Sequence, residues 1–205
     1  MDSQTRTGIL CVVSGPSGSG KTTLCHRMVR EGGCTFSISC TTRPPREGEI
    51  DGKDYHFIST GAFEDMIAAG QFLEHARVHQ HLYGTLKSSV TEQLQAGTDV
   101  LMDVDVQGAE LIRNCHDEAI QLARTDVFIL PPSIGELESR LRGRATESDE
   151  ELQLRMRNAA REMACRTAYE YTLFSATPEE DFARFSCIIR AERMRSSRLL
   201  PEELS

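Results

Sequence analysis

Three short apolar runs, each followed by a helical pattern, organise the hydrophobic positions of the chain. They read ILCVVS at residues 9–14, VLMDV at 100–104 and DVFIL at 126–130. Each run has the length of a buried strand, and the apolar residues after it recur at the spacing of one helix face. This alternation is typical of a parallel sheet covered by helices. We therefore expect an α/β fold with a parallel-sheet core.

The segment between the first two runs has a mixed pattern of short strands and short helices. Because this pattern interrupts the alternation of the core, we expect an inserted α+β lobe. Its strand candidates are residues 36–40, 55–58 and 72–78, and its helix candidates are 61–69 and 87–96, which stop at Gly70 and Gly97. The other expected elements are a helix that stops at Gly32 and Gly33, a charge-dense, mostly helical stretch at 140–166, a strand at 171–174 and a terminal helix at 179–199.

The composition indicates one soluble globular domain. A chain of 205 residues with 39% hydrophobic residues can bury a substantial core. The seven cysteines are odd in number and never spaced CxxC, which argues against a disulfide framework and a zinc site. We also find neither an apolar signal core in MDSQTRTG nor a run of the roughly 18 apolar residues that a membrane span needs. We expect a cytoplasmic protein without a membrane partner.

The stretch SISCTTRPPREGE, residues 37–49, places Arg43 and Arg46 around a diproline. A linker, a nucleic-acid patch and a pocket for one small phosphate are all compatible with this composition alone. The net charge of −8, and the net-acidic setting of residues 43–54, argue against nucleic-acid binding, which depends on many cations on one face. The charge pattern therefore favours one compact phosphate.

The segment GPSGSGKT, residues 15–22, matches the G-x-x-x-x-G-K-[ST] phosphate loop. It follows a buried strand and opens a helix, as the motif requires, so a chance Gly/Ser turn is a poor alternative. Its glycines let backbone N–H groups converge on phosphate oxygens, and its lysine reaches the outer phosphates. We expect a nucleoside triphosphate at these residues: Gly15, Pro16, Ser17, Gly18, Ser19, Gly20, Lys21, Thr22 and Thr23.

Thr22 and Asp103 are the candidate magnesium ligands. The Thr22 hydroxyl follows the phosphate-loop lysine, and Asp103 ends the apolar strand VLMDV. Kinases with this loop hold Mg²⁺ by such a hydroxyl and such a carboxylate. A solvated aspartate at a strand end is the alternative for Asp103.

The chain resembles the guanylate kinases, the GMP-phosphorylating branch of the nucleoside monophosphate kinases. The resemblance extends through most of the chain, in the order and at the spacing of that family. The motifs that carry it, besides the phosphate loop, are TTRPPREGEIDGKDYHF (41–57), FLEHA (72–76), LYGT (82–85), LMDVDVQGA (101–109), FILPPS (128–133), RLRGR (140–144) and IIRAER (188–193).

The resemblance implies one domain in three parts, and we expect a monomer or a weak homo-oligomer. It also implies the reaction ATP + GMP ⇌ ADP + GDP with Mg²⁺ as cofactor. The three parts would be a parallel-sheet P-loop kinase core (8–36, 98–136 and 166–200), a GMP-binding lobe (37–90) and a helical lid (137–165).

Eight residues correspond to the GMP site of the family. Arginine forks suit bidentate phosphate contacts, and a tyrosine hydroxyl adds a donor without a further charge. A carboxylate can accept from the N1–H and N2–H₂ groups of guanine, whereas adenine presents an acceptor at N1. The resemblance assigns the phosphate to Arg43, Arg46, Tyr55 and Tyr83, and the base to Ser39, Glu74, Thr85 and Asp105.

The resemblance assigns catalysis to Lys21, Arg43 and three lid arginines, Arg140, Arg144 and Arg155. Arginines that arrive from a mobile lid stabilise the charge of the transferred phosphoryl group and exclude water. From the residues alone, solvated charge on a helix surface is the alternative for each lid arginine.

The chain departs from the family at YEYTLFSAT, residues 169–177, where relatives commonly read something like YDYLIVND. Ser175 and Ala176 replace an Asn-Asp pair beside the expected position of the ATP adenine, so donor selectivity is left open. Leu82 replaces a second aromatic residue, which we expect to affect packing.

Two rival functions are a non-catalytic interaction module and another small-molecule kinase. The intact phosphate loop argues against the first, and Glu74 with its hydroxyl neighbours argues against the second.

Overall fold

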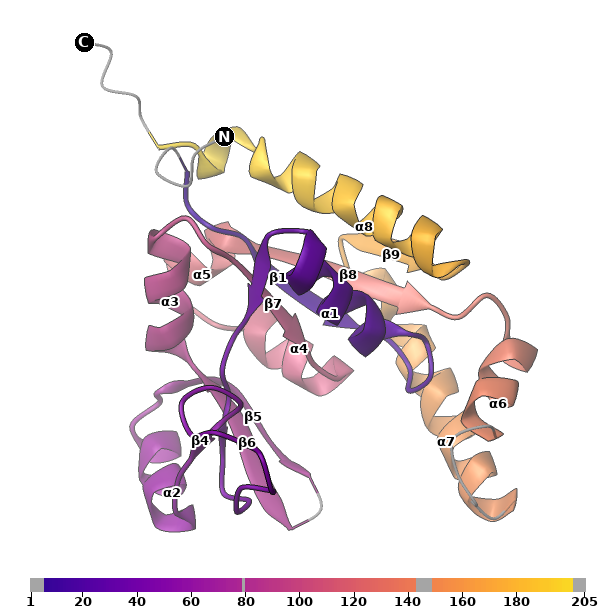
Figure 1. Cartoon of the computed structure of the whole chain (residues 1–205), viewed down its shortest axis with the longest axis horizontal. Coiled ribbons are helices and arrows are strands. Elements are labelled where there is room, and N and C mark those ends of the chain that lie inside the picture. Colours follow the sequence, from indigo (N-terminus) through magenta and orange to yellow (C-terminus); the bar gives the residue numbers. More distant parts are fainter. Residues whose placement is uncertain (1–5, 79, 143–148, 201–205) are drawn as a thin grey trace.

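A five-stranded parallel sheet forms the core of the computed structural model, which describes residues 6–78, 80–142 and 149–200 (Figure 1). The strand order is β2-β7-β1-β8-β9, and every neighbouring pair is parallel. The predicted α/β class is therefore confirmed. The strands are β1 (Leu10–Ser14), β2 (Cys34–Phe36), β7 (Asp99–Asp103), β8 (Arg124–Leu130) and β9 (Tyr171–Phe174).

Helices bury both faces of this sheet, which is why its strands are apolar on both sides. Cys11 and Val13 of β1 belong to the hydrophobic cluster under α1 (Lys21–Glu31) and α8 (Pro178–Arg193). Leu10 and Val12 belong to the cluster on the other face. The helices that contribute to that second cluster are α3 (Lys87–Gln95), α4 (Val106–Arg113) and α5 (Glu118–Ala123).

A second, four-stranded sheet has the order β4-β3-β6-β5 and mixed strand directions. Its small hydrophobic core is closed by α2, whose Phe63 stacks on Phe72 with 4.3 Å between ring centroids. These elements confirm the expected mixture of strands and a helix in this region. Their bounds are β3 (Cys40–Thr41), β4 (His56–Phe57), α2 (Thr60–Ala68), β5 (Phe72–Val78) and β6 (His81–Leu86).

Two expectations about individual elements were wrong, and one strand was not anticipated. The strand expected at 36–40 is interrupted, because β2 belongs to the core sheet and β3 to the second sheet. Strand β6 was not expected at all. The terminal helix α8 ends at Arg193, and only a 3₁₀ turn, η3 (Ser196–Arg198), follows it.

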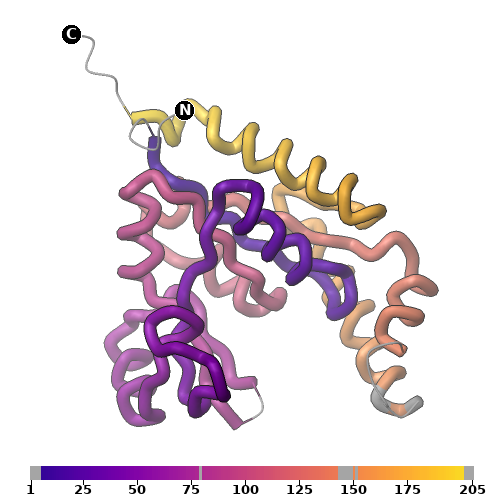
Figure 2. Tube along the Cα trace, viewed as in Figure 1, coloured from indigo at the N-terminus to yellow at the C-terminus, as the bar shows by residue number. Residues whose placement is uncertain are grey.

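The helices α6 (Ile134–Arg142) and α7 (Asp149–Ala164) form a separate pair with its own small apolar cluster. Leu137 and Leu141 of α6 meet Leu152 and Ala159 of α7 in this cluster. In the view of Figure 2 the second sheet lies at the lower left and this helix pair at the lower right, with the core above and between them. No helix in the described residues is long and apolar enough to cross a membrane.

The buried carboxylate of Asp99 links the first and last described segments of the chain. It accepts hydrogen bonds from the Arg6 guanidinium at 2.7 and 3.0 Å, from Arg193 Nε at 2.7 Å and from the Ile9 N–H at 3.0 Å. Four donors compensate the burial of one charge. Arg6 also pairs with Leu199 in an antiparallel bridge, so both ends of the described chain meet at one edge of the core.

Candidate active site

The phosphate loop connects β1 to α1 and is held in a tight turn. Gly20 precedes α1 with φ 99°, a left-handed conformation that favours glycine, and no side chain caps the helix N-terminus. A Cβ on Gly15 would lie 2.2 Å from the Ile129 carbonyl oxygen, so this position excludes larger residues. Lys21 Nζ donates to the carbonyl oxygens of Gly15 at 2.6 Å and Pro16 at 3.2 Å. The uncapped helix N–H groups and the folded-back ammonium together offer donors and positive charge to an anion.

The candidate magnesium residues meet at the mouth of this loop. The Thr22 hydroxyl donates to Asp103 Oδ2 at 2.8 Å. Within the described residues no group of three or more His, Cys, Asp or Glu side chains could hold a metal by itself. Mg²⁺ takes oxygen ligands and is commonly held by one or two protein groups together with substrate phosphates and water. The Thr22–Asp103 pair therefore fits a magnesium ion bound mainly through a nucleotide.

A cavity of about 570 Å³ opens between the core sheet and the second sheet. The structure brings six of the eight predicted GMP-binding residues together on its walls, and Thr22 and Asp103 line it as well. The six residues are Ser39, Tyr55, Glu74, Tyr83, Thr85 and Asp105. The two arginines, Arg43 and Arg46, do not line the cavity itself.

A chain of polar groups crosses the wall of this cavity on the second sheet. Ser39 Oγ lies 3.1 Å from Thr85 Oγ1, and the Thr85 hydroxyl donates to Glu74 Oε1 at 2.8 Å. Burial raises the pKa of Glu74, and the nearby Asp105 carboxylate raises it further. Asp105 also caps α4 by accepting from the Gly108 N–H at 2.7 Å. Glu74 is therefore a partly desolvated carboxylate, whose charged form a further hydrogen-bond donor would stabilise.

The two predicted phosphate arginines lie beside the same cavity. The Arg43 guanidinium carbon is 5.5 Å from the Tyr55 ring centroid, and the rings of Tyr55 and Tyr83 are 6.0 Å apart. Arg43 donates to both oxygens of Glu49, at 2.9 and 2.8 Å. This pairing with Glu49, together with the Tyr83 hydroxyl, raises the pKa of Arg43. The side chain of Arg46 is exposed, and its main-chain N–H donates to Glu49 at 2.7 Å.

Two of the three predicted lid arginines lie in the described residues, while Arg144 lies outside them. Arg155 of α7 donates through Nη2 to Ser17 Oγ of the phosphate loop at 2.9 Å. Arg140 of α6 donates to Glu136, one turn earlier, at 2.9 Å. The structure thus brings Arg155 to the loop directly.

Sequence reasoning missed Glu49 and Glu162. Glu162 of α7 accepts from the main chain of Ser17. Burial raises its pKa, whereas the nearby Lys21 ammonium lowers it. The signal for Glu162 was its separation of seven residues from Arg155, which places both side chains on one helix face. The signal for Glu49 was its place in the motif TTRPPREGE.

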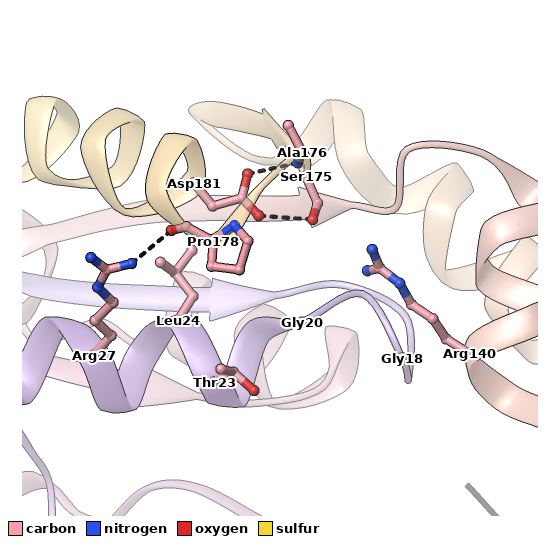
Figure 3. A pocket seen from close by; sticks show the side chains of 10 residues that line it. All are labelled: Gly18, Gly20, Thr23, Leu24, Arg27, Arg140, Ser175, Ala176, Pro178 and Asp181. Atoms are coloured by element: carbon pink, nitrogen blue, oxygen red, sulfur yellow. Dashed lines mark hydrogen bonds between the residues drawn. The ribbon is translucent and has the colours of Figure 1, made fainter. Parts of the chain in front are cut away.

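A second cavity, of about 270 Å³, lies on the other side of the phosphate loop (Figure 3). Gly18, Gly20 and Thr23 form its loop side, and Arg140 enters from α6. The opposite wall is the turn between β9 and α8, which contains the departing residues Ser175 and Ala176. The two cavities flank one anion site, an arrangement that suits two substrates sharing a phosphate.

Comparison with known proteins agrees with this geometry. The sequence model of the guanylate kinase family matches residues 7–192. The chain is 44% identical to the guanylate kinase of Paramagnetospirillum magneticum, over 94% of this chain and 89% of that one. It is 46% identical to the guanylate kinase of Sphingopyxis alaskensis, over 94% of this chain and 86% of that one. A crystal structure of guanylate kinase from Anaplasma phagocytophilum is 30% identical in sequence, with a TM-score of 0.72. The match covers 96% of this chain and 92% of that one. The chain belongs to the guanylate kinase family.

Proposed function

We propose that this protein transfers the γ-phosphoryl group of ATP to GMP, giving ADP and GDP. One observation carries the proposal: the 570 Å³ cavity has the Thr22–Asp103 pair of the phosphate site on one wall and the Ser39–Thr85–Glu74 chain on another. A ligand that fills it presents a phosphate to the loop and a base to a carboxylate. Guanine would supply two further N–H donors to the Glu74 carboxylate.

The acceptor phosphate is the nucleophile in this proposal. It is already anionic near neutral pH, so positioning and charge stabilisation supply the catalysis without a dedicated base. Arg43, Arg46, Tyr55 and Tyr83 would hold it. The nearness of the Arg43 guanidinium to the Tyr55 ring and to the Tyr83 hydroxyl supports this assignment.

The donor triphosphate would occupy the phosphate loop, with its nucleoside in the 270 Å³ cavity. Lys21 would exchange its bonds to the loop carbonyls for bonds to phosphate oxygens. Mg²⁺, held by Thr22 and Asp103, would neutralise charge on the β- and γ-phosphates. Arg140, Arg144 and Arg155 would close over the transferred group, and the contact from Arg155 to Ser17 supports this role.

A coupled ADP-release assay with GMP, AMP, UMP and dTMP tests the proposal. Turnover should be largely confined to GMP, because the lone pair of adenine N1 would face the Glu74 carboxylate, and sites of this type discriminate by ~10⁴ to 10⁵-fold. Comparable turnover with AMP contradicts the base assignment. GMP binding without ADP release indicates a non-catalytic interaction module instead.

We further propose that the protein acts in the cytoplasm as a monomer or weak homo-oligomer. All seven cysteines are free and four are buried, which is typical of a reducing compartment. Both cavities are lined by one chain, so the proposed reaction needs no second copy.

A further inference from the structure

The two cavities differ in how their polar groups are used. In the cavity at the β9–α8 turn, Asp181 is the only carboxylate that the described residues place on the wall, and it is 8% exposed. Its two oxygens accept from the Ser175 hydroxyl and from the Ala176 N–H, both at 2.8 Å (Figure 3). Ser175 is itself buried, at 6% exposed. The Ser175 hydroxyl and the Ala176 amide of the turn, and the Asp181 carboxylate of α8, therefore hydrogen-bond to one another.

The two arginines on the wall of this cavity are also engaged. Arg27 donates to the Pro178 carbonyl oxygen at 3.1 Å and to Glu31 at 3.1 Å, and its guanidinium covers the Phe182 ring at 4.4 Å. Arg140 donates to Glu136 through Nε. A guanidinium attracts the face of any aromatic base and does not distinguish a 6-amino from a 6-oxo group at the base edge. What this cavity offers a base is therefore contact with the face of the ring, and not recognition of its edge.

The guanine-side cavity shows the opposite arrangement. There the Ser39–Thr85 pair leads to Glu74, whose carboxylate receives the Thr85 hydroxyl and is positioned to read a base edge. A site built to pair with a base edge discriminates by ~10⁴ to 10⁵-fold. By contrast, a base in the cavity at the β9–α8 turn would gain at most a single main-chain hydrogen bond at the rim. Such a bond changes the affinity for the nucleotide by about tenfold at most.

We propose that Ser175 masks Asp181, so that the donor site accepts purine nucleoside triphosphates irrespective of the base edge. GTP and ITP then serve as phosphoryl donors alongside ATP, while the acceptor remains GMP. This inference rests on the proposed phosphoryl transfer. It makes the two sites of one enzyme unequal, with a selective acceptor site and a permissive donor site.

The test uses radiolabelled GMP and measures labelled GDP formed with ATP, GTP or ITP in the presence of Mg²⁺. The three kcat/KM values should lie within about tenfold of one another, as expected when at most one rim hydrogen bond differs. A preference for ATP larger than this overturns the inference.

Displacement of a fluorescent ATP analogue by each triphosphate, with GMP saturating the acceptor cavity and Mg²⁺ omitted, repeats the comparison without turnover. Similar displacement by ATP, GTP and ITP supports the inference even if phosphoryl transfer fails. ATP-selective displacement overturns it. The two measurements therefore separate a failure of the proposed reaction from a failure of the donor-site inference.

Ser175→Ala tests the masking itself. Without the hydroxyl, Asp181 Oδ2 can accept from the 6-amino group of adenine and repels the 6-oxo group of guanine, so the ATP-to-GTP ratio should rise by about tenfold or more. Ser186→Ala, the same change on α8 outside the cavity lining, should leave the ratio unchanged. An unchanged ratio in Ser175→Ala overturns the assignment of Ser175.

Discussion

Both carboxylate oxygens of Glu49 accept hydrogen bonds from Arg43, and one of them also accepts the main-chain N–H of Arg46. A single side chain thus fixes both residues of the proposed phosphate clamp. Besides the two bonds to Glu49, Arg43 Nη1 donates to the Pro44 carbonyl oxygen at 2.8 Å, which leaves Nε–H and a second Nη2 hydrogen for other acceptors. A phosphate therefore meets a preset guanidinium, which lowers the entropy lost on binding.

Glu49→Ala should raise the KM for GMP about tenfold while changing kcat little, because it releases Arg43 without removing it. Steady-state kinetics with GMP as the varied substrate measure the effect. Glu47→Ala is the matched control, since Glu47 is an exposed glutamate of the same segment. A lower KM in Glu49→Ala would mean that Glu49 competes with the phosphate for Arg43.

Glu74→Gln should weaken GMP binding at least about tenfold, because an amide replaces a charged acceptor and presents N–H groups to donors. Calorimetric titration of GMP into both proteins measures it. Equal affinities would remove the carboxylate from guanine recognition.

The raised pKa of Glu74 predicts the pH dependence of binding. In the proposed complex the ionised carboxylate accepts from guanine, so GMP affinity should fall as the pH drops through this pKa. The fall should begin at a higher pH than an ordinary glutamate would give, and Glu74→Gln should keep only the fall that protonation of the GMP phosphate causes. Titrations across an acidic pH series measure the shift.

The same group has the opposite effect on the stability of the free protein. A raised pKa means that the folded state holds the proton more tightly than the unfolded state, so stability falls as the pH rises through the window between the two pKa values. Glu74→Gln should therefore raise the Tm of the free protein at neutral pH. An unchanged or lower Tm would contradict an unfavourable burial of this charge.

Lys21→Met should abolish turnover and leave GMP affinity nearly unchanged. Lys21 contacts the phosphate loop, whereas the Ser39–Thr85–Glu74 chain, proposed to bind guanine, lies at the second sheet. ADP release and GMP calorimetry on one preparation measure both quantities. Unchanged turnover would refute the assignment of Lys21.

Arg155→Ala should lower kcat by ~10³-fold or more, the range found for arginines that stabilise phosphoryl transfer. The KM for GMP should change little, because Arg155 contacts Ser17 of the phosphate loop. Arg157→Ala is the control, since Arg157 is an exposed arginine on the same helix. Equal losses in both variants would indicate a general disturbance of α7.

The core and the phosphate loop could be predicted because their signals are local. Val12 and Leu101 lie in runs that are apolar on both faces, as a covered parallel strand requires. The loop is a continuous motif whose neighbours are a strand and a helix. Each of these features is written within a few consecutive residues.

The misread elements depend on partners that are distant in the sequence. Phe36 pairs with Leu101 in the core sheet, whereas Cys40 pairs with Gly84 in the second sheet, and the residues between them do not encode that change. Strand β6 lacks a regular apolar pattern because it contains Gly84, where a Cβ would lie 2.9 Å from the Phe72 ring. Close approach of two strands, and not alternation, explains this glycine.

The same contrast between local signals and distant partners applies to the residues of the candidate site. Arg43 and Glu74 stand in recognisable motifs, so their types and positions could be named from the sequence. Glu49 and Glu162 acquire a role only through the residues that they contact, Arg43 and Ser17. A carboxylate in a charged segment resembles any solvated charge until its partner is known.

The bridge between Arg6 and Leu199 brings two distant parts of the backbone side by side, with the Thr7 N–H donating to the Arg198 carbonyl oxygen at 2.9 Å. A short linker could join them and close the polypeptide into a ring. His116 is exposed and lines neither of the two cavities, so it offers a place to reopen the ring. Such a circular permutant should keep its activity, because neither cavity depends on the order in which its walls are synthesised.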